Sequence, residues 1–169
     1  METAIVSLIC IALIMFGGMT MSQGFFTSVD SSTNGLQELG QRDENIMRTN
    51  LIPESTNLAT PDQLEVSLKN TGQTKLADYS RWDFIVMYYD QASNYHAVWM
   101  PYKESPGNNE WQVKEITLDG GSEIFEKGVL NPGETITLRA YIDPSVGGNA
   151  NMVVVSTPGG VTASTYFSP

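Results

Sequence analysis

The chain opens with a long apolar segment. No charged residue occurs between Thr3 and Val29, and large apolar side chains recur there with no polar stripe between them. At roughly 1.5 Å per residue, a helix over this segment would reach about 40 Å, enough to cross a bilayer with some tilt. Because so many apolar side chains cannot stay in water, the pattern predicts a helix that is buried in lipid or in other protein.

The second half of this segment contains small residues. Gly17, Gly18 and Gly24 stand among large side chains, and small residues allow neighbouring helices to approach closely. The same glycines are compatible with an ordinary membrane anchor, so both interpretations stay open. Residues 30–35 form a polar break, and apolar residues at near-helical spacing predict a second, weaker helical segment over residues 36–50.

Beyond a short linker marked by Pro53 and Pro61, the pattern changes from helical to alternating. Leu64, Val66 and Leu68 alternate with polar residues, which is typical of a half-buried strand. Turn-forming residues separate seven or eight such segments. The predicted strands are residues 64–68, 82–89, 95–102, 111–118, 123–129, 135–142, 151–157 and 161–167. The fold class is therefore predicted to be α+β, with a long hydrophobic N-terminal α-helix followed by an immunoglobulin-like antiparallel β-sandwich.

This change of pattern divides the chain into two parts. Residues 1–50 are predicted to form the hydrophobic helix and a neck, and residues 51–169 the β-sandwich. The second part has about 120 residues, which is enough for one compact domain. One soluble domain is therefore expected behind the helix.

Charge narrows the choice of partners. The chain has 9 basic and 19 acidic residues and a net charge of -10, so a phosphate backbone would repel it and nucleic acid is not an expected partner. No Lys or Arg precedes the apolar segment, although a signal peptide or a membrane helix usually has basic residues there. Either processing has removed them or insertion is directed in another way. The single cysteine, Cys10, excludes a disulfide within the chain.

Residues with catalytic or metal-binding potential are sparse. His96 is the only histidine, and no second His or Cys lies nearby to complete a zinc site. The chain contains no phosphate-binding glycine loop and no nucleophile elbow. The acidic residues match no known calcium loop and are expected to form a solvated surface, although a bound divalent cation stays open. The sequence thus predicts no cofactor, no metal, no catalytic residue and no enzymatic activity.

Aromatic residues gather in the first half of the β domain. They could line a sugar-binding face, but in a small sandwich they more often supply core and subunit contacts. The residues are Trp82, Tyr88, Tyr89, Tyr95, Trp99, Tyr102 and Trp111.

The β domain also resembles a known family. The stretch LEVSLKNTGQTKL at residues 64–76, followed by WDFIVMYY at residues 82–89, is similar to the start of the β domain in archaellins. Archaellins are the filament subunits of the archaellum, a rotary swimming filament built by machinery related to type IV pili. The resemblance implies an extracellular, cell-surface filament that is a helical polymer of this chain. It further implies a prepilin-type peptidase that removes a basic leader, a membrane assembly platform and transient membrane insertion before assembly.

The chain departs from the archaellin pattern at its start. Thr3 stands where an early glycine is common, and Glu2 stands where archaellins have an apolar residue. A carboxylate at this end is costly to bury unless it is neutralised or paired, and a free amino terminus would be its natural partner. The alternative is that Glu2 lies in water.

In a filament, the predicted assembly interface is the helix surface, packed against neighbouring helices at the filament axis. Contacts that repeat head to tail without closing produce an open fibre. The interface residues are Glu2, Ile5, Leu8, Ile9, Ile11, Leu13, Ile14, Phe16, Gly17, Gly18, Phe25 and Phe26. Two other interpretations stay open: an adhesive type IV-like pilin and a membrane-anchored accessory β domain, such as the stator-like components that accompany archaella. The environment of the helix, protein or lipid, distinguishes them.

Overall fold

The computed structural model describes residues 2–122, 126–148 and 150–169. The chain divides into two compact units, Met1–Asp43 and Glu44–Pro169. We refer to them as the helix unit and the β unit and describe each by itself. Residues 44–50, which the sequence pattern assigns to the first part, group with the β unit.

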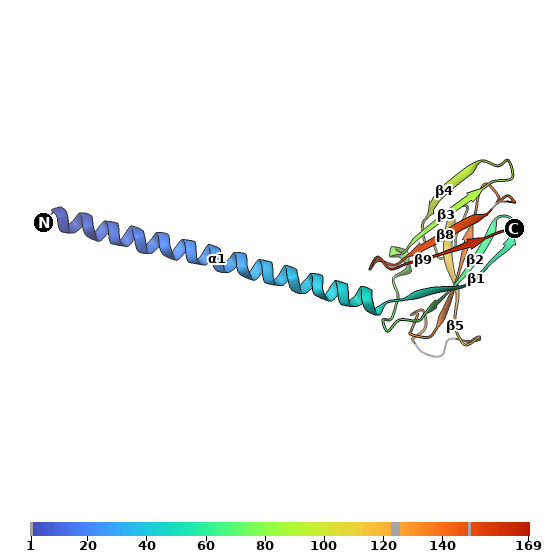
Figure 1. Ribbon diagram of the computed structural model, residues 1–169, viewed down its shortest axis with the longest axis horizontal. Helices are drawn as coiled ribbons and strands as arrows, with labels where there is room; N and C mark the ends of the chain where they lie inside the picture. The colour runs from blue at the N-terminus through green and yellow to red at the C-terminus, as the bar shows by residue number, and fades with distance from the viewer. Residues whose placement is uncertain (1, 123–125, 149) are drawn as a thin grey trace. The chain divides into compact units, whose positions relative to one another are not determined.

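Helix α1 runs without interruption from Glu2 to Arg48 (Figure 1). The predicted break at residues 30–35 is therefore wrong. Ser32 and Thr33 donate hydroxyl hydrogen bonds to the carbonyl oxygens of Ser28 and Val29, each at 2.9 Å. Side chains that bond back to the preceding turn in this way satisfy their polar groups without ending the helix.

The β unit is a sandwich of two antiparallel sheets, as Figure 1 shows. The first sheet has the strand order β1-β2-β7-β5-β6, formed by β1 Leu51–Thr60, β2 Gln63–Asn70, β7 Thr135–Tyr141, β5 Glu110–Leu118 and β6 Gly121–Ser122. The second sheet has the order β4-β3-β8-β9, formed by β4 Tyr95–Met100, β3 Asp83–Tyr89, β8 Asn151–Ser156 and β9 Thr162–Phe167. A short 3-10 helix, η1 Tyr79–Arg81, precedes β3. The predicted α+β class with an antiparallel β-sandwich is confirmed.

The core lies between the two sheets and follows the alternation of the strands. Every second residue of β2, β7, β3 and β8 is buried there. The buried Trp111 of β5 stacks on Phe84 of β3, with ring centroids 5.5 Å apart, and so joins the two sheets. Such aromatic pairs add stability beyond the area they bury.

Two sequence predictions fail in the β unit. The segment predicted as a linker forms β1, an edge strand that tolerates Pro53 because a register shift follows this residue and because an edge strand does not need every N–H for its ladder. The strand predicted at residues 123–129 is also wrong in part. Residues 123–125 lie outside the described residues, and residues 126–128 form a bend and a turn before Leu130 pairs with Leu76.

Candidate functional site

The predicted interface residues all lie on α1. The large apolar side chains among them are exposed, from 52% for Ile9 to 74% for Ile14. Successive helical residues are turned by about 100°, so these side chains point in all directions and form no single stripe. A Cβ atom on Gly17 or Gly18 would meet nothing within 4 Å outside the nearby helical backbone. The side chain of Glu2 lies outside the described part of the chain.

Helix α1 is long and apolar enough to cross a membrane, judged by its length and composition. A helix that is apolar on every side fits a lipid environment and also the centre of a helical bundle. The apolar side chains therefore have to be buried, but their distribution around the helix fits lipid and protein surroundings equally well.

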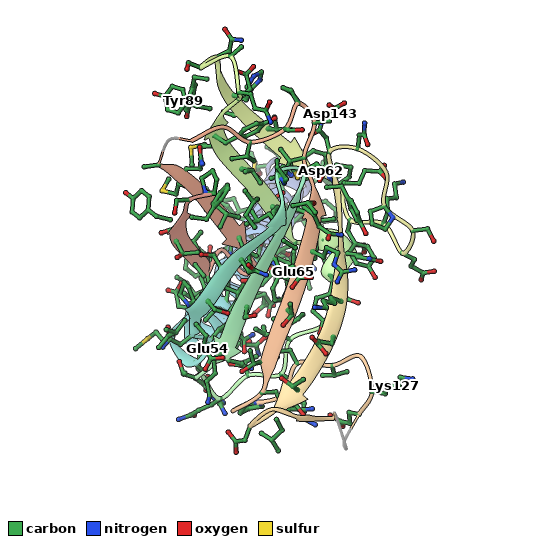
Figure 2. All side chains as sticks on the ribbon, turned by 90° about the vertical axis from the view of Figure 1, so that its right-hand side faces the viewer. Glu54, Asp62, Glu65, Tyr89, Lys127 and Asp143 are labelled. Carbon is green, nitrogen blue, oxygen red and sulfur yellow. The ribbon has the colours of Figure 1, made fainter. Side chains whose placement is uncertain are left out.

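The outer face of the first sheet is polar and its charges are paired. Glu65 of β2, which is labelled in Figure 2, lies on this face. It accepts hydrogen bonds from Arg139 Nη2 at 2.7 Å and from Lys114 Nζ at 3.1 Å. Burial of Glu65 alone would raise its pKa, but the hydrogen bonds from Arg139 and Lys114 outweigh this effect and leave the pKa below its ordinary value. The cluster stabilises the sheet and carries no unpaired group for chemistry.

The only histidine closes a hairpin. His96 Nε2 lies 3.0 Å from Asp90 Oδ2, and the His96 ring stacks on Tyr88 with centroids 5.1 Å apart. Asp90 Oδ1 also accepts the backbone N–H groups of Ala92 and Asn94, both at 2.8 Å. The contact with His96 is the largest cause that holds the pKa of Asp90 well below its usual range, followed by the bonds from Asn94. Asp90 and His96 therefore fix the turn between β3 and β4.

The last turn of α1 belongs to the β unit and is held by the turn after β2. Gln73 N donates to Arg48 O at 2.7 Å, and Thr71 N donates to Asn50 O at 3.0 Å. A Cβ atom on Gly72 would lie 2.5 Å from Arg48 O and 2.6 Å from Asn50 N. Only glycine leaves room for this close approach of two backbone segments.

Asn70 organises the same turn from inside the protein. Its side chain is fully buried, and Nδ2 donates to Thr74 O at 2.8 Å and to Leu130 O at 3.3 Å. Its Oδ1 accepts from Gly72 N at 3.1 Å. A buried amide with all its groups paired specifies one backbone arrangement. The KNTG stretch at residues 69–72, which is part of the segment that resembles archaellins, thus forms the junction between the end of α1 and the sandwich.

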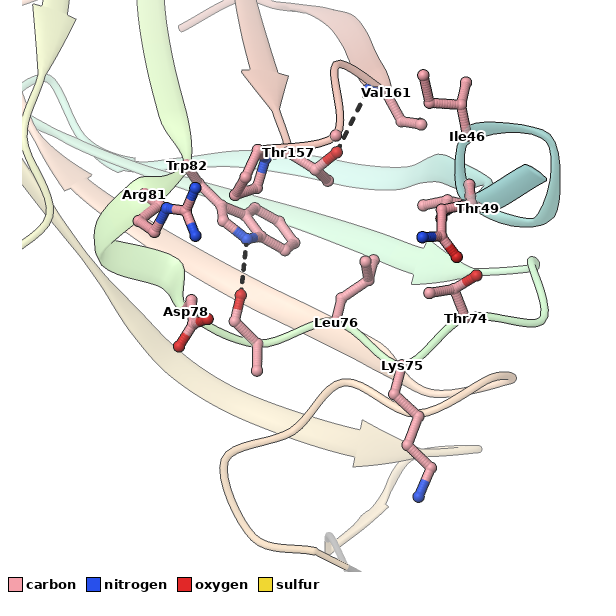
Figure 3. A pocket seen from close by; sticks show the side chains of 14 residues that line it. Ile46, Thr49, Thr74, Lys75, Leu76, Asp78, Arg81, Trp82, Thr157 and Val161 are labelled. Carbon is pink, nitrogen blue, oxygen red and sulfur yellow. Dashed lines mark hydrogen bonds between the residues drawn. The ribbon is translucent and has the colours of Figure 1, made fainter. Parts of the chain in front are cut away.

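A cavity of about 270 Å³ lies beside this junction, within the β unit (Figure 3). Ile46, Leu76 and Trp82 contribute to its wall. Trp82 Nε1 donates to Ala77 O at 3.1 Å, and Val161 N donates to Thr157 Oγ1 at 3.2 Å. The charged side chains of the wall are those of Lys75, Asp78 and Arg81. In the described ranges, no group of three or more His, Cys, Asp or Glu residues could hold a metal ion.

The aromatic residues that the sequence grouped together separate into two sets. Trp82, Tyr88 and Trp111 are buried in the core. Tyr95 and Trp99 are 57% and 56% exposed on the outer face of the second sheet. The sequence alone does not show which of these aromatic residues are buried, because the first residue of a strand can point either into the core or out of it.

Comparison with known proteins identifies the fold. No protein-family model matches the chain, and no curated protein sequence matches it. The archaellum periplasmic stator protein FlaG from Sulfolobus acidocaldarius matches with a TM-score of 0.52 and 18% identity, over 70% of this chain and 99% of that chain. The periplasmic stator complex of FlaF and FlaG from the same organism matches with a TM-score of 0.51 and 17% identity, over 69% of this chain and 87% of that chain. At this level of identity the likeness shows a shared fold. Both structures are of stator proteins and not of archaellins.

Proposed function

We propose that the chain is a membrane-anchored accessory β domain, of the stator-like kind that accompanies an archaellum. The observation that carries this proposal is the match to FlaG over 70% of this chain and 99% of the FlaG chain, together with a helix that could cross a membrane. On this proposal the β domain lies outside the cytoplasm. The apolar side chains from Ile5 to Phe26 then face lipid.

The proposed role is mechanical and involves no catalysis. A static component must transmit load between the membrane and its β domain without yielding. The junction around Asn70 and Gly72 suits this task, because paired backbone groups hold the last turn of α1 against the sandwich. Glu65 bonds to Arg139 and Asp90 bonds to His96, and these contacts make the β domain more rigid.

A second candidate is a filament subunit, either an archaellin or an adhesive type IV-like pilin. The similarity of residues 64–76 and 82–89 to archaellins favours it. In that case the surface of α1 packs against other copies in a helical polymer. Processing by a prepilin-type peptidase, an assembly platform and transient membrane insertion would then be needed.

The two candidates differ in where the chain resides. We would tag it at its C-terminus, shear the filaments from the cells, and extract the remaining membranes with alkaline carbonate. A stator-like anchor is expected in the carbonate-resistant membrane fraction, and its deletion should leave filaments that do not rotate. Recovery as the repeating subunit of the sheared filaments, with no filaments after deletion, would overturn the anchor proposal.

A further inference from the structure

The two sheets of the sandwich have contrasting outer faces. On the first sheet, outward positions of β2 and β7 are polar or charged, such as Glu65, Lys69 and Arg139. On the second sheet, the corresponding positions are mostly apolar or aromatic. We refer to these nine residues as the apolar face: Ile85, Met87, Tyr89, Tyr95, Ala97, Trp99, Met152, Val154 and Tyr166.

The strand register makes the apolar face continuous. Ile85 pairs with Trp99 on one side and with Val154 on the other. Met152 pairs with Tyr166, and Tyr89 pairs with Tyr95 at a ring-centroid distance of 5.3 Å. Directly opposed residues in an antiparallel sheet have Cβ atoms about 4.5–5.5 Å apart, so their side chains touch. The face is therefore one patch that crosses all four strands.

The patch is comparable in area with the largest apolar patch of a typical monomer. Tyr89, Tyr95, Trp99 and Tyr166 are 37%, 57%, 56% and 73% exposed. At roughly 150–250 Å² for a whole aromatic side chain, these four expose about 350–550 Å². The largest patch on a typical monomer is about 300–600 Å² and is often functional. The aliphatic members of the face add to this area, so the patch is expected to bind a partner.

Charge indicates which partner fits. The chain has a net charge of -10, yet the outward positions of the second sheet carry one charged group, Asp83, which accepts a hydrogen bond from Trp99 Nε1 at 2.9 Å. Two copies can therefore meet through this face without opposing many like charges, which would otherwise cost several kcal/mol. Two such faces in contact would bury about 700–1,100 Å² from the aromatic rings alone, which reaches the roughly 1,000 Å² lower limit of a specific interface before the aliphatic members are counted.

A carbohydrate fits the patch less well. Sugar recognition needs polar groups beside the stacking rings to bind hydroxyl groups. Across the strands Trp99 pairs with Ile85 and Tyr89 pairs with Tyr95, and the carboxylate beside Trp99, that of Asp83, already accepts a hydrogen bond from its indole.

We propose that the apolar face binds the same face of a second copy of this chain and forms a symmetric dimer. A two-fold contact of this kind uses one patch twice. The inference does not depend on the proposed function, because anchored domains and filament subunits could both pair in this way. Attachment to a membrane would favour it, since anchored copies have a high effective concentration.

Cysteine cross-linking of the full chain in lipid nanodiscs tests the proposal. In a Cys10→Ser background, Ser164→Cys places a thiol on the second sheet, and Ser55→Cys places one on the first sheet as a matched control. Both serines are exposed strand residues. A flexible bis-maleimide should yield dimers from Ser164→Cys, at least tenfold more than from Ser55→Cys. Equal yields at the two sites, or none at Ser164→Cys, would overturn the proposal.

Charge substitutions then separate the apolar face from any association of the helices. Tyr95→Lys and Tyr166→Lys, each added to Ser164→Cys, should lower the cross-linked fraction at least tenfold, and Ser55→Lys should leave it unchanged. An unchanged melting curve would confirm that the variants fold, as their exposed positions predict. Undiminished dimer in folded lysine variants would contradict the proposal. A monomeric chain whose tryptophan fluorescence shifts with an added polysaccharide, and no longer shifts after Trp99→Ala, would replace it with carbohydrate binding.

Discussion

Gly72 and Arg48 lie so close together that a Cβ atom on Gly72 would be 2.5 Å from Arg48 O. The approach brings the turn after β2 against the last residue of α1, and Gln73 N bonds to the same carbonyl oxygen at 2.7 Å. The backbone of a single turn thus holds the end of the helix. This contact explains why a glycine follows Asn70 and Thr71.

The contact predicts that Gly72→Ala destabilises the β unit. The added methyl group must displace backbone atoms on both sides, and overpacking of this kind costs about 1–3 kcal/mol. Urea unfolding of the detergent-solubilised chain measures the loss. Gly107→Ala is the matched control, because the nearest atom to its Cβ would be Glu110 Oε2 at 3.6 Å. Equal stability of the two variants would show that the junction is loose.

A second prediction concerns Asp90 and pH. Hydrogen bonds, above all from His96, lower the pKa of Asp90 in the folded protein, so the folded state binds fewer protons than the unfolded state. The stabilisation is therefore present above the unfolded pKa of about 3.9 and is lost as the pH falls below it. Asp90→Asn should lower the free energy of unfolding at pH 7, and the gap to the wild type should narrow towards pH 3.

The control for this measurement is Asp119→Asn. The Asp119 side chain is 85% exposed and lies 4.0 Å from Lys69. An exposed ion pair contributes little to stability, so this variant should follow the wild type across the pH range. A gap for Asp90→Asn that stays constant from pH 7 to pH 3 would argue against the ionic role of Asp90.

The cluster of Glu65 and Arg139 gives a third prediction. Arg139 donates to Glu65 Oε1 from both Nε and Nη2, at 3.0 and 2.7 Å. Because the pair is only partly exposed, a double-mutant cycle with Glu65→Gln and Arg139→Met should give a coupling energy of about 0.5–1 kcal/mol. Denaturant unfolding of the four proteins measures it, and added salt should reduce it. A coupling near zero would mean that solvent screens the pair.

The sequence predicts those parts of the fold that depend on local alternation. Leu64, Val66 and Leu68 alternate as expected and are buried in the core. The continuous helix could not be predicted, because Ser32 and Thr33 satisfy their hydroxyl groups only once the helix exists. Likewise, β1 forms because it pairs with β2, whereas its own composition, with Pro53, is typical of a linker.

The sequence predicts one of the two apolar surfaces, the helix, but not the apolar face of the second sheet. The apolar helix is evident because its residues are contiguous. The apolar face of the second sheet joins residues from four strands, and its existence depends on the register that sets Ile85 beside Trp99 and Val154. The pair of Asp90 and His96 likewise requires the hairpin between β3 and β4 to be formed.

The last prediction tests the membrane anchor. Residues 3–29 include eleven Leu, Ile, Phe and Val residues, which favour insertion by roughly 3–7 kcal/mol on a scale of about 0.3–0.6 kcal/mol each. An arginine near the centre of the helix costs about 2.5–3.5 kcal/mol, so Ile11→Arg combined with Ile14→Arg should offset the whole preference. The double variant should be lost from the carbonate-resistant membrane fraction. Gln37→Arg combined with Gln41→Arg adds the same charge to the polar part of α1 and should remain there. Full retention of the Ile11 and Ile14 variant would mean that protein, and not lipid, surrounds this part of the helix.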